Sequence, residues 1–231
     1  MEHPLVSCIM LVGRTPQSSI LSTIDCFKKQ TYPYKELIVV NNSKTHFEAV
    51  GLNLKAERDV FLVDTPFMCS AGMARNYGIS ASNGQILAQF DADSWHAPSR
   101  IESQIATIAE NQAHIAVLNE TLSYSFISGR ASYHTNNKKA ILNTMVFVRP
   151  SQLDYPNVEK QEEFGLLTKM QSQQMKIISM PSPELACKLH IGDEPITKPQ
   201  NCGLSADHYK TIKKIIKNYS NFTDSNESSR F

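Results

Sequence analysis

Two aspartates, Asp91 and Asp93, stand one residue apart just after an apolar run that ends at Phe90. Residues two apart on an extended strand point to the same side, so the two carboxylates are expected to lie side by side. Such a pair repels unless a cation lies between its members. Mg²⁺ is commonly held by one or two carboxylates together with the phosphate oxygens of a substrate. The spacing therefore indicates a site for a divalent ion and a diphosphate; the alternative is that one aspartate caps a turn and the other faces water.

The elements around this pair alternate between strands and helices. Short apolar runs rich in β-branched residues predict buried strands at 5–12, 36–40, 60–63 and 85–90. Helical spacing of apolar residues predicts helices at 20–27, 47–54, 71–81 and 98–111. This alternation is typical of a parallel sheet with helices on both faces.

Ligands of such sheets bind at the carboxyl ends of the strands. The candidates for binding at those ends are Gly13, Arg14, Asn41, Asn42, Asp64, Asp91, Ala92 and Asp93. The two aspartates follow the fourth strand, and this position makes a ligand-binding role more specific than their spacing alone does.

The alternation stops after about residue 115. Strands are expected at 115–118, 123–127, 142–148, 176–180 and 185–190, and helices at 160–170 and 204–218. Neither a repeat nor a linker is visible, so the pattern predicts one domain over residues 1–217. In it, residues 1–98 form a nucleotide-sugar-binding half and residues 99–217 an acceptor half. Residues 218–231 are polar and poor in aliphatic side chains, which predicts a disordered tail.

The composition suits a single globular domain with its own core, at 231 residues and 41% apolar side chains. With a net charge of only +1, the chain as a whole is not expected to bind nucleic acid. Five scattered cysteines without a CxxC pair indicate a reducing compartment and inert thiols. The N-terminus does not resemble a signal peptide, and no apolar stretch approaches the roughly 20 residues of a transmembrane segment. These features favour a cytoplasmic location, including the inner face of a membrane.

Four segments, in order, resemble the family 2 glycosyltransferases, enzymes with the GT-A fold. They are PLVSCIMLVGRTP, KQTYPYKELIVVNNS, AGMARNYGISASNGQILAQFDADSWHAPSRI, and NTMVFVRP followed by QEEFGLL. The third is the most specific, because it combines a Gly-x-x-x-Arg-Asn-x-Gly helix, a strand, and a DxD followed by Trp and Pro. The resemblance covers roughly residues 4–192. It implies a largely parallel central sheet flanked by helices, with a smaller mixed sheet on the acceptor side.

The resemblance also implies roles for single residues. Asp91 matches an aspartate near the ribose and diphosphate, and Asp93 matches the aspartate that binds Mn²⁺ or Mg²⁺. Arg75 matches a residue near the nucleotide, where its charge would help to hold the diphosphate; the alternative is a surface arginine. Glu162 and Glu163 match the acidic pair that supplies the catalytic base, with Glu163 the better match. Glutamates also favour the first turn of any helix, because they complement its dipole.

Further residues of the matched segments carry two interpretations each. His190 matches a histidine that completes the metal site or contacts phosphate in several relatives, with a structural histidine as the alternative. Gly72 and Gly78 allow close packing, or close approach of the backbone to a nucleotide. Trp95 is expected to pack in the core rather than to line the sugar site.

The chain departs from the family pattern at two places. Asn41 and Asn42 stand where many members have an acidic residue that contacts uracil, although an amide can still pair with a base edge. Ser94 replaces a third aspartate. Because Asp91 and Asp93 are retained, the resemblance implies metal-dependent, inverting transfer of a sugar from a nucleotide-diphosphate sugar to a hydroxyl of a glycan or other acceptor. The alternatives are an inactive binding protein on the same fold and a nucleotidyltransferase. Nucleotidyltransferases usually carry a Gly-rich, basic loop after the first strand, whereas the segment VGRTPQSS has one glycine and one basic residue.

Overall fold

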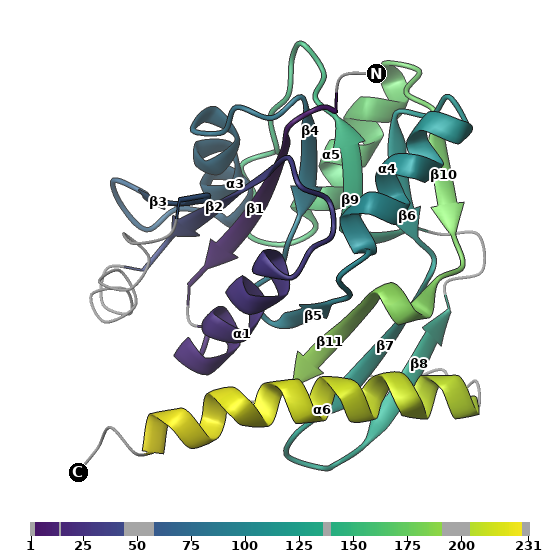
Figure 1. Cartoon of the computed structure of the whole chain (residues 1–231). Coiled ribbons are helices and arrows are strands. Elements are labelled where there is room, and N and C mark those ends of the chain that lie inside the picture. Colours follow the sequence, from purple (N-terminus) through teal and green to yellow (C-terminus); the bar gives the residue numbers. More distant parts are fainter. Residues whose placement is uncertain (1–2, 14, 44–57, 136–139, 191–203, 228–231) are drawn as a thin grey trace.

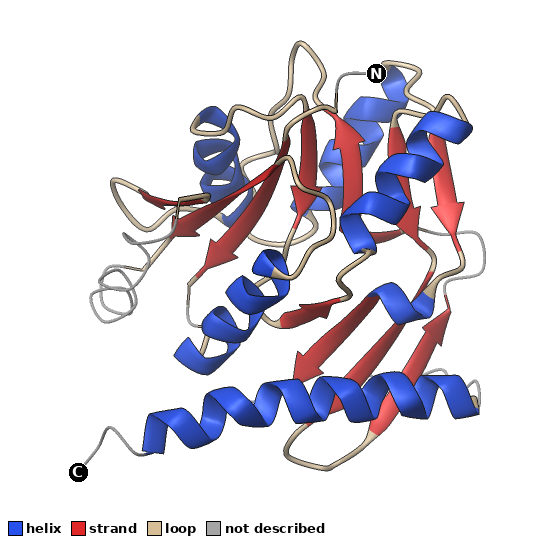
Figure 2. Cartoon of the chain, viewed as in Figure 1, coloured by secondary structure: helices blue, strands red, loops and turns tan. Residues whose placement is uncertain are grey.

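The computed structural model describes residues 3–13, 15–43, 58–135, 140–190 and 204–227. These residues form two sheets with helices packed around them (Figures 1 and 2). Arg14 and the helix expected at 47–54 lie outside the described residues.

The larger sheet has seven strands in the order β10-β6-β9-β4-β1-β2-β3. They are β1 (Val6–Val12), β2 (Lys35–Asn41), β3 (Val60–Asp64), β4 (Ile86–Gln89), β6 (Ile115–Leu118), β9 (Ile141–Val148) and β10 (Ile177–Met180). Strand β9 runs antiparallel to its neighbours β4 and β6, whereas the other pairs are parallel. The expected largely parallel central sheet is confirmed.

The smaller sheet has four strands in the order β5-β11-β7-β8. They are β5 (Ser94–His96), β7 (Glu120–Ser125), β8 (Ala131–Thr135) and β11 (Ala186–His190). Strand β11 is parallel to β7 and antiparallel to β5, so the expected mixed sheet is confirmed. Strands β5 and β8 were not expected from the sequence. The three residues of β5 become a strand through pairing with β11, as Trp95 opposite Cys187 shows, and no local pattern contains such a distant contact.

Helices cover both faces of the larger sheet (Figure 2). They are α1 (Gln17–Lys28), α3 (Ala71–Ser80), α4 (Arg100–Glu110) and α5 (Glu162–Ser172), with the short 3₁₀ helix η1 (Pro183–Leu185) and the long α6 (Ala206–Glu227) elsewhere. Alternate residues of β1 enter different cores: Cys8 and Met10 pack in the core with α1 and α4, and Ile9 packs in the core with α3 and α5. Burial of both faces explains why residues 8–12 of this strand form an uninterrupted apolar run.

Close packing accounts for both glycines of α3. A Cβ atom on Gly78 would lie 2.6 Å from Val40 Cγ2, and a Cβ atom on Gly72 would lie 1.9 Å from the Pro156 carbonyl oxygen. Glycine therefore lets α3 approach the sheet on one side and the segment before α5 on the other. Trp95 is 8% exposed and belongs to the core, as expected.

Helix α6 lies along the smaller sheet and continues to Glu227, so the expected disordered tail is wrong for residues 218–227 (Figure 1). Tyr219, inside that stretch, is 2% exposed and its ring centroid lies 4.4 Å from that of Phe126. Its hydroxyl lies 3.0 Å from Ser18 Oγ of α1. One buried aromatic ring thus fixes a segment that is poor in aliphatic residues; residues 228–231 lie outside the described part.

Cys8, Cys26, Cys69 and Cys187 are free thiols. Burial raises the pKa of Cys8 to about 12 and that of Cys26 to about 11, so both stay protonated. The expectation of inert thiols is confirmed for these two, while Cys202 is not among the described residues. In the described parts of the chain, none of the helices has both the length and the apolar character that a membrane crossing requires.

Candidate active site

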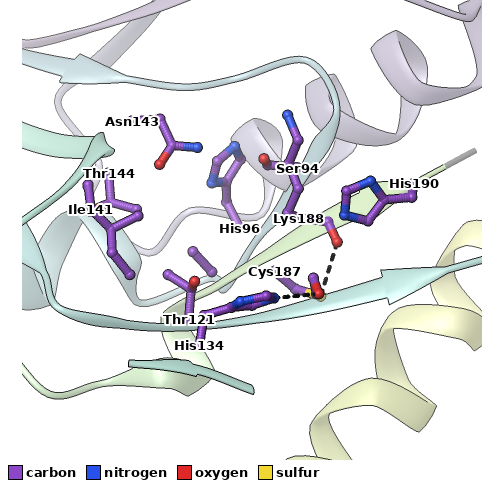
Figure 3. Close-up of a pocket in the computed structure, with 12 residues that line it drawn as sticks. Ser94, His96, Thr121, His134, Ile141, Asn143, Thr144, Cys187, Lys188 and His190 are labelled. Atoms are coloured by element: carbon purple, nitrogen blue, oxygen red, sulfur yellow. Dashed lines mark hydrogen bonds between the residues drawn. The ribbon is translucent and has the colours of Figure 1, made fainter. Parts of the chain in front are cut away.

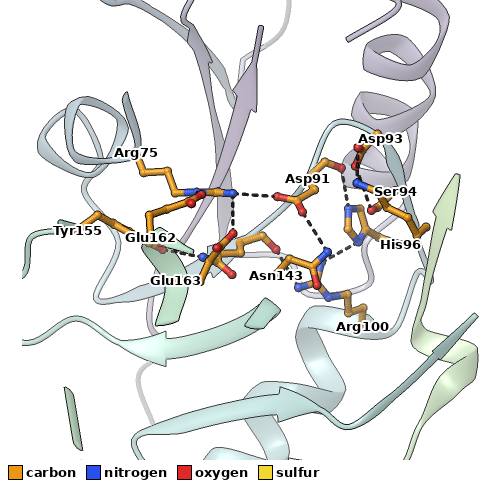
Figure 4. A network of polar contacts seen from close by, with 12 residues as sticks. Arg75, Asp91, Asp93, Ser94, His96, Arg100, Asn143, Tyr155, Glu162 and Glu163 are labelled. Atoms are coloured by element: carbon orange, nitrogen blue, oxygen red, sulfur yellow. Dashed lines mark hydrogen bonds and ion pairs between the residues drawn. The ribbon is translucent and has the colours of Figure 1, made fainter. Parts of the chain in front are cut away.

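The turn after β4 carries Asp91 and Asp93 from the larger sheet to the smaller one, because β4 belongs to the first and β5 to the second. Residues 92 and 93 form a turn, in which Ser94 N donates to the Asp91 carbonyl oxygen at 3.2 Å. The expectation of an extended backbone at the pair is wrong, because strand geometry ends at Gln89. The two carboxylates consequently contact different partners (Figure 4).

Asp91 is held through both carboxylate oxygens. Its Oδ1 accepts from Arg75 Nη2 at 3.3 Å, and its Oδ2 accepts from Asn143 Nδ2 at 3.1 Å. Burial opposes the charge, yet Arg75, Lys188 and the Asn143 amide together lower the pKa of Asp91. Asp91 is therefore an ionised carboxylate with a fixed orientation.

Arg75 of α3 joins three carboxylates (Figure 4). Besides Asp91, it pairs with Glu162 through Nε and with Glu163 through Nη2, each at 3.2 Å. The residue is only 5% exposed, so the surface-arginine alternative is wrong. Burial opposes its charge, but the surrounding acids raise the pKa of Arg75, which remains a cation. Its Nη1 is buried and has no hydrogen-bond partner among the residues that the structure describes.

Glu162 and Glu163 begin α5 and point toward Arg75. Gln161, just before them, has a φ of 64°, a left-handed conformation that is strained for a residue with a side chain. The Glu162 side chain is 7% exposed and that of Glu163 is 18% exposed. Burial raises the pKa of Glu163, Arg75 opposes this rise, and Glu162 adds to it; the net direction is upward. A partly accessible carboxylate with a raised pKa is suited to general-base chemistry.

Asp93 is the more accessible aspartate. Its Oδ2 forms an ion pair with Lys188 Nζ of β11, and the two side chains are 38% and 36% exposed. Ser94 Oγ lies 3.5 Å from the other carboxylate oxygen. The backbone is also attached to β11, since Leu189 N donates to the Asp93 carbonyl oxygen at 2.9 Å. The smaller sheet therefore fixes Asp93, whereas Asp91 is fixed by α3 and β9.

A buried arginine supports the turn from the core side. Arg100 donates to His96 Nδ1 at 2.7 Å and to the Gln89 carbonyl oxygen at 2.8 Å. Because a guanidinium only donates, His96 Nδ1 accepts, and Nε2 carries the proton that faces the Asp91 carbonyl oxygen at 3.3 Å. Burial and the neighbouring Arg100 hold the pKa of His96 well below its usual value, so the ring is neutral. Burial lowers the pKa of Arg100 to about 10, which leaves it charged at neutral pH.

A cavity of about 290 Å³ lies beside the turn, between the two sheets (Figure 3). Most of the residues that line it have polar side chains, among them Ser94, Thr121, His134, Asn143, Lys188 and His190. The four acidic side chains do not line it, but it adjoins them, because Asn143 bonds Asp91 and Lys188 pairs with Asp93. Ligand pockets commonly start at roughly 300 Å³, so the cavity suits one small polar group.

The two asparagines after β2 are engaged within the protein. Asn41 Nδ2 donates to Asp64 Oδ1, and Asn42 Nδ2 donates to the Cys69 carbonyl oxygen, both at 2.7 Å. Asn42 Oδ1 also accepts from Cys69 N at 3.0 Å. These bonds shape the loops at the ends of β2 and β3, and contact with a base stays a prediction.

The remaining predicted residues lie around the same sheet edge. Gly13 follows β1 and has open space, since a Cβ atom there would meet nothing within 4 Å. Ala92 is buried, and its carbonyl oxygen accepts from Thr23 Oγ1 at 3.0 Å. His190 lies at the end of β11 and lines the cavity, on the same side as Lys188. The ligand-binding roles of these residues stay predictions.

Sequence reasoning missed Asn143 and Lys188, each of which contacts an aspartate. Both interrupt apolar strands, ILNTMVFV and ACKLH, and a polar side chain within such a run is a signal that could have pointed to them. It also missed Tyr155, whose hydroxyl accepts from Gln89 Nε2 at 2.7 Å and whose ring lies 5.9 Å from the Arg75 guanidinium.

The donor set fits a divalent ion that takes most of its ligands from a substrate. In the described part of the chain, no three His, Cys, Asp or Glu side chains are grouped as they would be to hold an ion alone. Asp93 offers a partly exposed carboxylate, and Mg²⁺ commonly binds one or two carboxylates together with substrate phosphates. Asp93 with a diphosphate therefore makes a chemically adequate set.

Comparison with known proteins gives a family match. The model described as "Glycosyl transferase family 2" matches residues 8–176. The uncharacterized glycosyltransferase MJ1057 of Methanocaldococcus jannaschii is 27% identical over 116 residues, which is 48% of this chain and 40% of that protein. UDP-Glc:alpha-D-GlcNAc-diphosphoundecaprenol beta-1,3-glucosyltransferase WfgD of Escherichia coli is 25% identical over 168 residues, or 73% of this chain and 60% of that protein. The chain thus spans 40–60% of the length of these two relatives.

Solved structures share the fold. S. aureus TarS superposes with a TM-score of 0.63 at 13% identity, over 80% of this chain and 36% of that chain. The mannosyltransferase PcManGT from Pyrobaculum calidifontis, in complex with GDP-Man and Mn²⁺, superposes with a TM-score of 0.62 at 15% identity, over 82% of this chain and 57% of that chain. The expected GT-A fold is confirmed.

Proposed function

The chain belongs to glycosyl transferase family 2, and we propose that it moves a sugar from a nucleotide-diphosphate sugar to an acceptor hydroxyl, with inversion and with a divalent ion. The grouping of Asp91, Arg75 and Glu163 at the carboxyl end of β4, one turn from Asp93, carries this proposal. Structures that share the fold hold such donors: TarS has been solved with UDP and with UDP-GlcNAc.

In this proposal the donor lies across the carboxyl ends of β1, β2 and β4. Asp93 holds the ion together with the diphosphate, and Asp91 lies beside the ribose and diphosphate. When bound, Mn²⁺ or Mg²⁺ offsets the negative charge that develops on the leaving diphosphate. Arg75 and Asn143 keep Asp91 ionised and oriented, so the donor enters a site whose geometry is already fixed.

Glu163 is the proposed base. Its carboxylate takes the proton of the acceptor hydroxyl as that oxygen forms a bond to the anomeric carbon of the sugar. The bond from that carbon to the phosphate oxygen breaks, and its electron pair leaves with the nucleoside diphosphate. Glu162 is more deeply buried and pairs with Arg75 Nε, so its proposed role is to position Arg75 and to raise the pKa of Glu163.

The acceptor is proposed to be a glycan or another hydroxyl-bearing molecule. The cavity beside the turn is lined by Thr121, Ser123, His134 and Asn143, whose hydroxyl, imidazole and amide groups suit a sugar more than an apolar chain. Location in the cytoplasm, including the inner face of a membrane, is part of the same proposal; the free thiols of the described cysteines support it.

Thermal unfolding with UDP-, GDP-, CMP- and dTDP-sugars, each with and without Mn²⁺, tests the proposal. We expect one nucleotide sugar to stabilise the chain in the presence of Mn²⁺, and Asp93→Ala to abolish the Mn²⁺-dependent part. Glu163→Gln should keep this binding and lose transfer. Stabilisation by none of these sugars would point to an inactive binding protein, and transfer by Glu163→Gln would place the base elsewhere.

A further inference from the structure

Lys188 forms an ion pair with Asp93, the aspartate that is proposed to hold the divalent ion. It lies opposite Ser94 in the pairing of β11 with β5, which brings its side chain to the turn. Its ammonium pairs with Asp93 Oδ2, while the side chain stays 36% exposed and borders the cavity (Figure 3). A lysine of the smaller sheet thus offsets the charge of the carboxylate that is proposed to bind the divalent ion.

Two other cations of the described site are held inside the protein. Arg75 is buried among three carboxylates, and Arg100 is fully buried with bonds to His96 and Gln89. The Arg75 Nη1 atom that has no partner in the described part of the chain is itself buried, so both arginines are less accessible to a ligand than Lys188. Lys188 has a long flexible stem and three donors, so its ammonium can turn from Asp93 to a phosphate oxygen nearby.

We propose that Lys188 is a phosphate-binding residue of the donor site, and that it competes with the divalent ion for Asp93. Without ligand, Lys188 holds Asp93. When a nucleoside diphosphate and the ion bind, the ion takes the Asp93 carboxylate and the Lys188 ammonium contacts the diphosphate. Lys188 thereby gives the site some affinity for a nucleoside diphosphate even without metal. This inference rests on the proposed function.

The competition makes two opposite predictions for one substitution. Lys188→Met removes the charge but keeps much of the apolar stem. Metal-free affinity for the nucleoside diphosphate should fall by about tenfold or more, because a charge-assisted contact is lost. Affinity for Mn²⁺ alone should rise, because Asp93 has lost its competitor. Lys188→Arg should keep the metal-free affinity within about threefold of the parent chain, since the charge remains.

Asp93→Asn separates this inference from a purely metal-based site. It removes the negative charge that pairs with Lys188, so metal-free binding of the diphosphate should be kept or strengthened, while the gain caused by Mn²⁺ disappears. A site in which Asp93 acts only through the ion, with no part for Lys188, predicts the same metal-free affinity for Lys188→Met and the parent chain.

Titration calorimetry on the full chain measures the affinity for UDP or GDP without metal, the affinity for the same nucleotide with Mn²⁺, and the affinity for Mn²⁺ alone. Lys169→Met is a matched control, because Lys169 pairs with Asp154 on the surface with 43% of its side chain exposed. If the parent chain binds UDP or GDP and Lys188→Met binds it equally well without metal, the role of Lys188 is wrong. If Lys188→Met binds Mn²⁺ no better than the parent chain, the competition is wrong. If the parent chain binds neither nucleotide even with Mn²⁺, and none of the nucleotide sugars stabilises it against thermal unfolding, the proposed function itself fails.

Discussion

Replacing Arg75 by methionine leaves three carboxylates in a buried site without their shared cation. Removing one partner of a buried ion pair costs about 3–5 kcal/mol. The side chains of Asp91 and Glu163 keep 16% and 18% exposure, so water relieves part of the cost and the lower end applies, about 3 kcal/mol. A chain of this size loses roughly 2–4 °C in Tm per kcal/mol, so Arg75→Met should lower the Tm by roughly 6–12 °C.

The loss should depend on pH with a defined sign. In the parent chain Arg75 helps to depress the pKa of Asp91, so its contribution to stability is present above the ordinary aspartate pKa and is lost as the pH falls through the depressed value. In Arg75→Met the orphaned carboxylates take up protons more readily, which relieves the repulsion at low pH. The difference in free energy of unfolding between the two chains should therefore be larger at pH 8 than at pH 5.

Urea unfolding at both pH values, followed by the fluorescence of the single tryptophan, Trp95, measures this difference. Adding Glu163→Gln to Arg75→Met removes one of the orphaned charges and should recover part of the lost stability at pH 8. An equal loss at pH 5 and pH 8, with no recovery in the double variant, would refute the assignment of Arg75 as the cation that compensates this cluster.

Three more substitutions follow from the structure. Glu163→Gln should lower kcat by about 10²–10⁴-fold. It should also remove the fall of kcat/KM at low pH, whose apparent pKa in the parent chain should be above that of an ordinary glutamate because the pKa of Glu163 is raised. A fall at low pH that survives in the variant would belong to another group. Gly78→Ala forces a methyl group to within 2.6 Å of Val40 Cγ2 and should destabilise the chain by about 1–3 kcal/mol in urea unfolding. Gly13→Ala is the control for folding stability, because its methyl group meets nothing within 4 Å, and equal losses would contradict the packing argument. Tyr219→Ala should cost about 3 kcal/mol by the same measurement, since a buried ring is removed, and unchanged stability would mean that α6 does not dock as described.

The sequence predicted the parts of the fold that depend on local pattern. Residues 8–12 of β1 and 37–40 of β2 are continuous apolar runs because both faces of these strands are buried, and this pattern can be recognised without knowledge of the neighbouring strands. Strand β5 could not be predicted in this way, since Ser94–His96 becomes a strand only by pairing with β11. The end of α6 was misplaced for a similar reason: the packing of Tyr219 on distant Phe126 outweighs the polar composition around it.

The site residues show the same difference between local patterns and distant contacts. Asp91, Asp93 and the glutamate pair could be predicted as site residues because the motif and its position after a strand are local. Arg75 was found, but its burial among three acids was not, because two of them lie in α5, far along the chain. The partners Asn143 and Lys188 were missed: a polar side chain within an apolar strand marks each of them for attention, but the sequence pattern does not show that they reach the aspartates.

The two aspartates are near neighbours in sequence, but their side chains are held by different sheets. Arg75 and Asn143 tie Asp91 to the side of the larger sheet, and Lys188 ties Asp93 to the smaller one. A tilt of one sheet against the other would therefore change the separation of the two carboxylates, and a ligand that bridges both carboxylates would hold the two sheets at one angle.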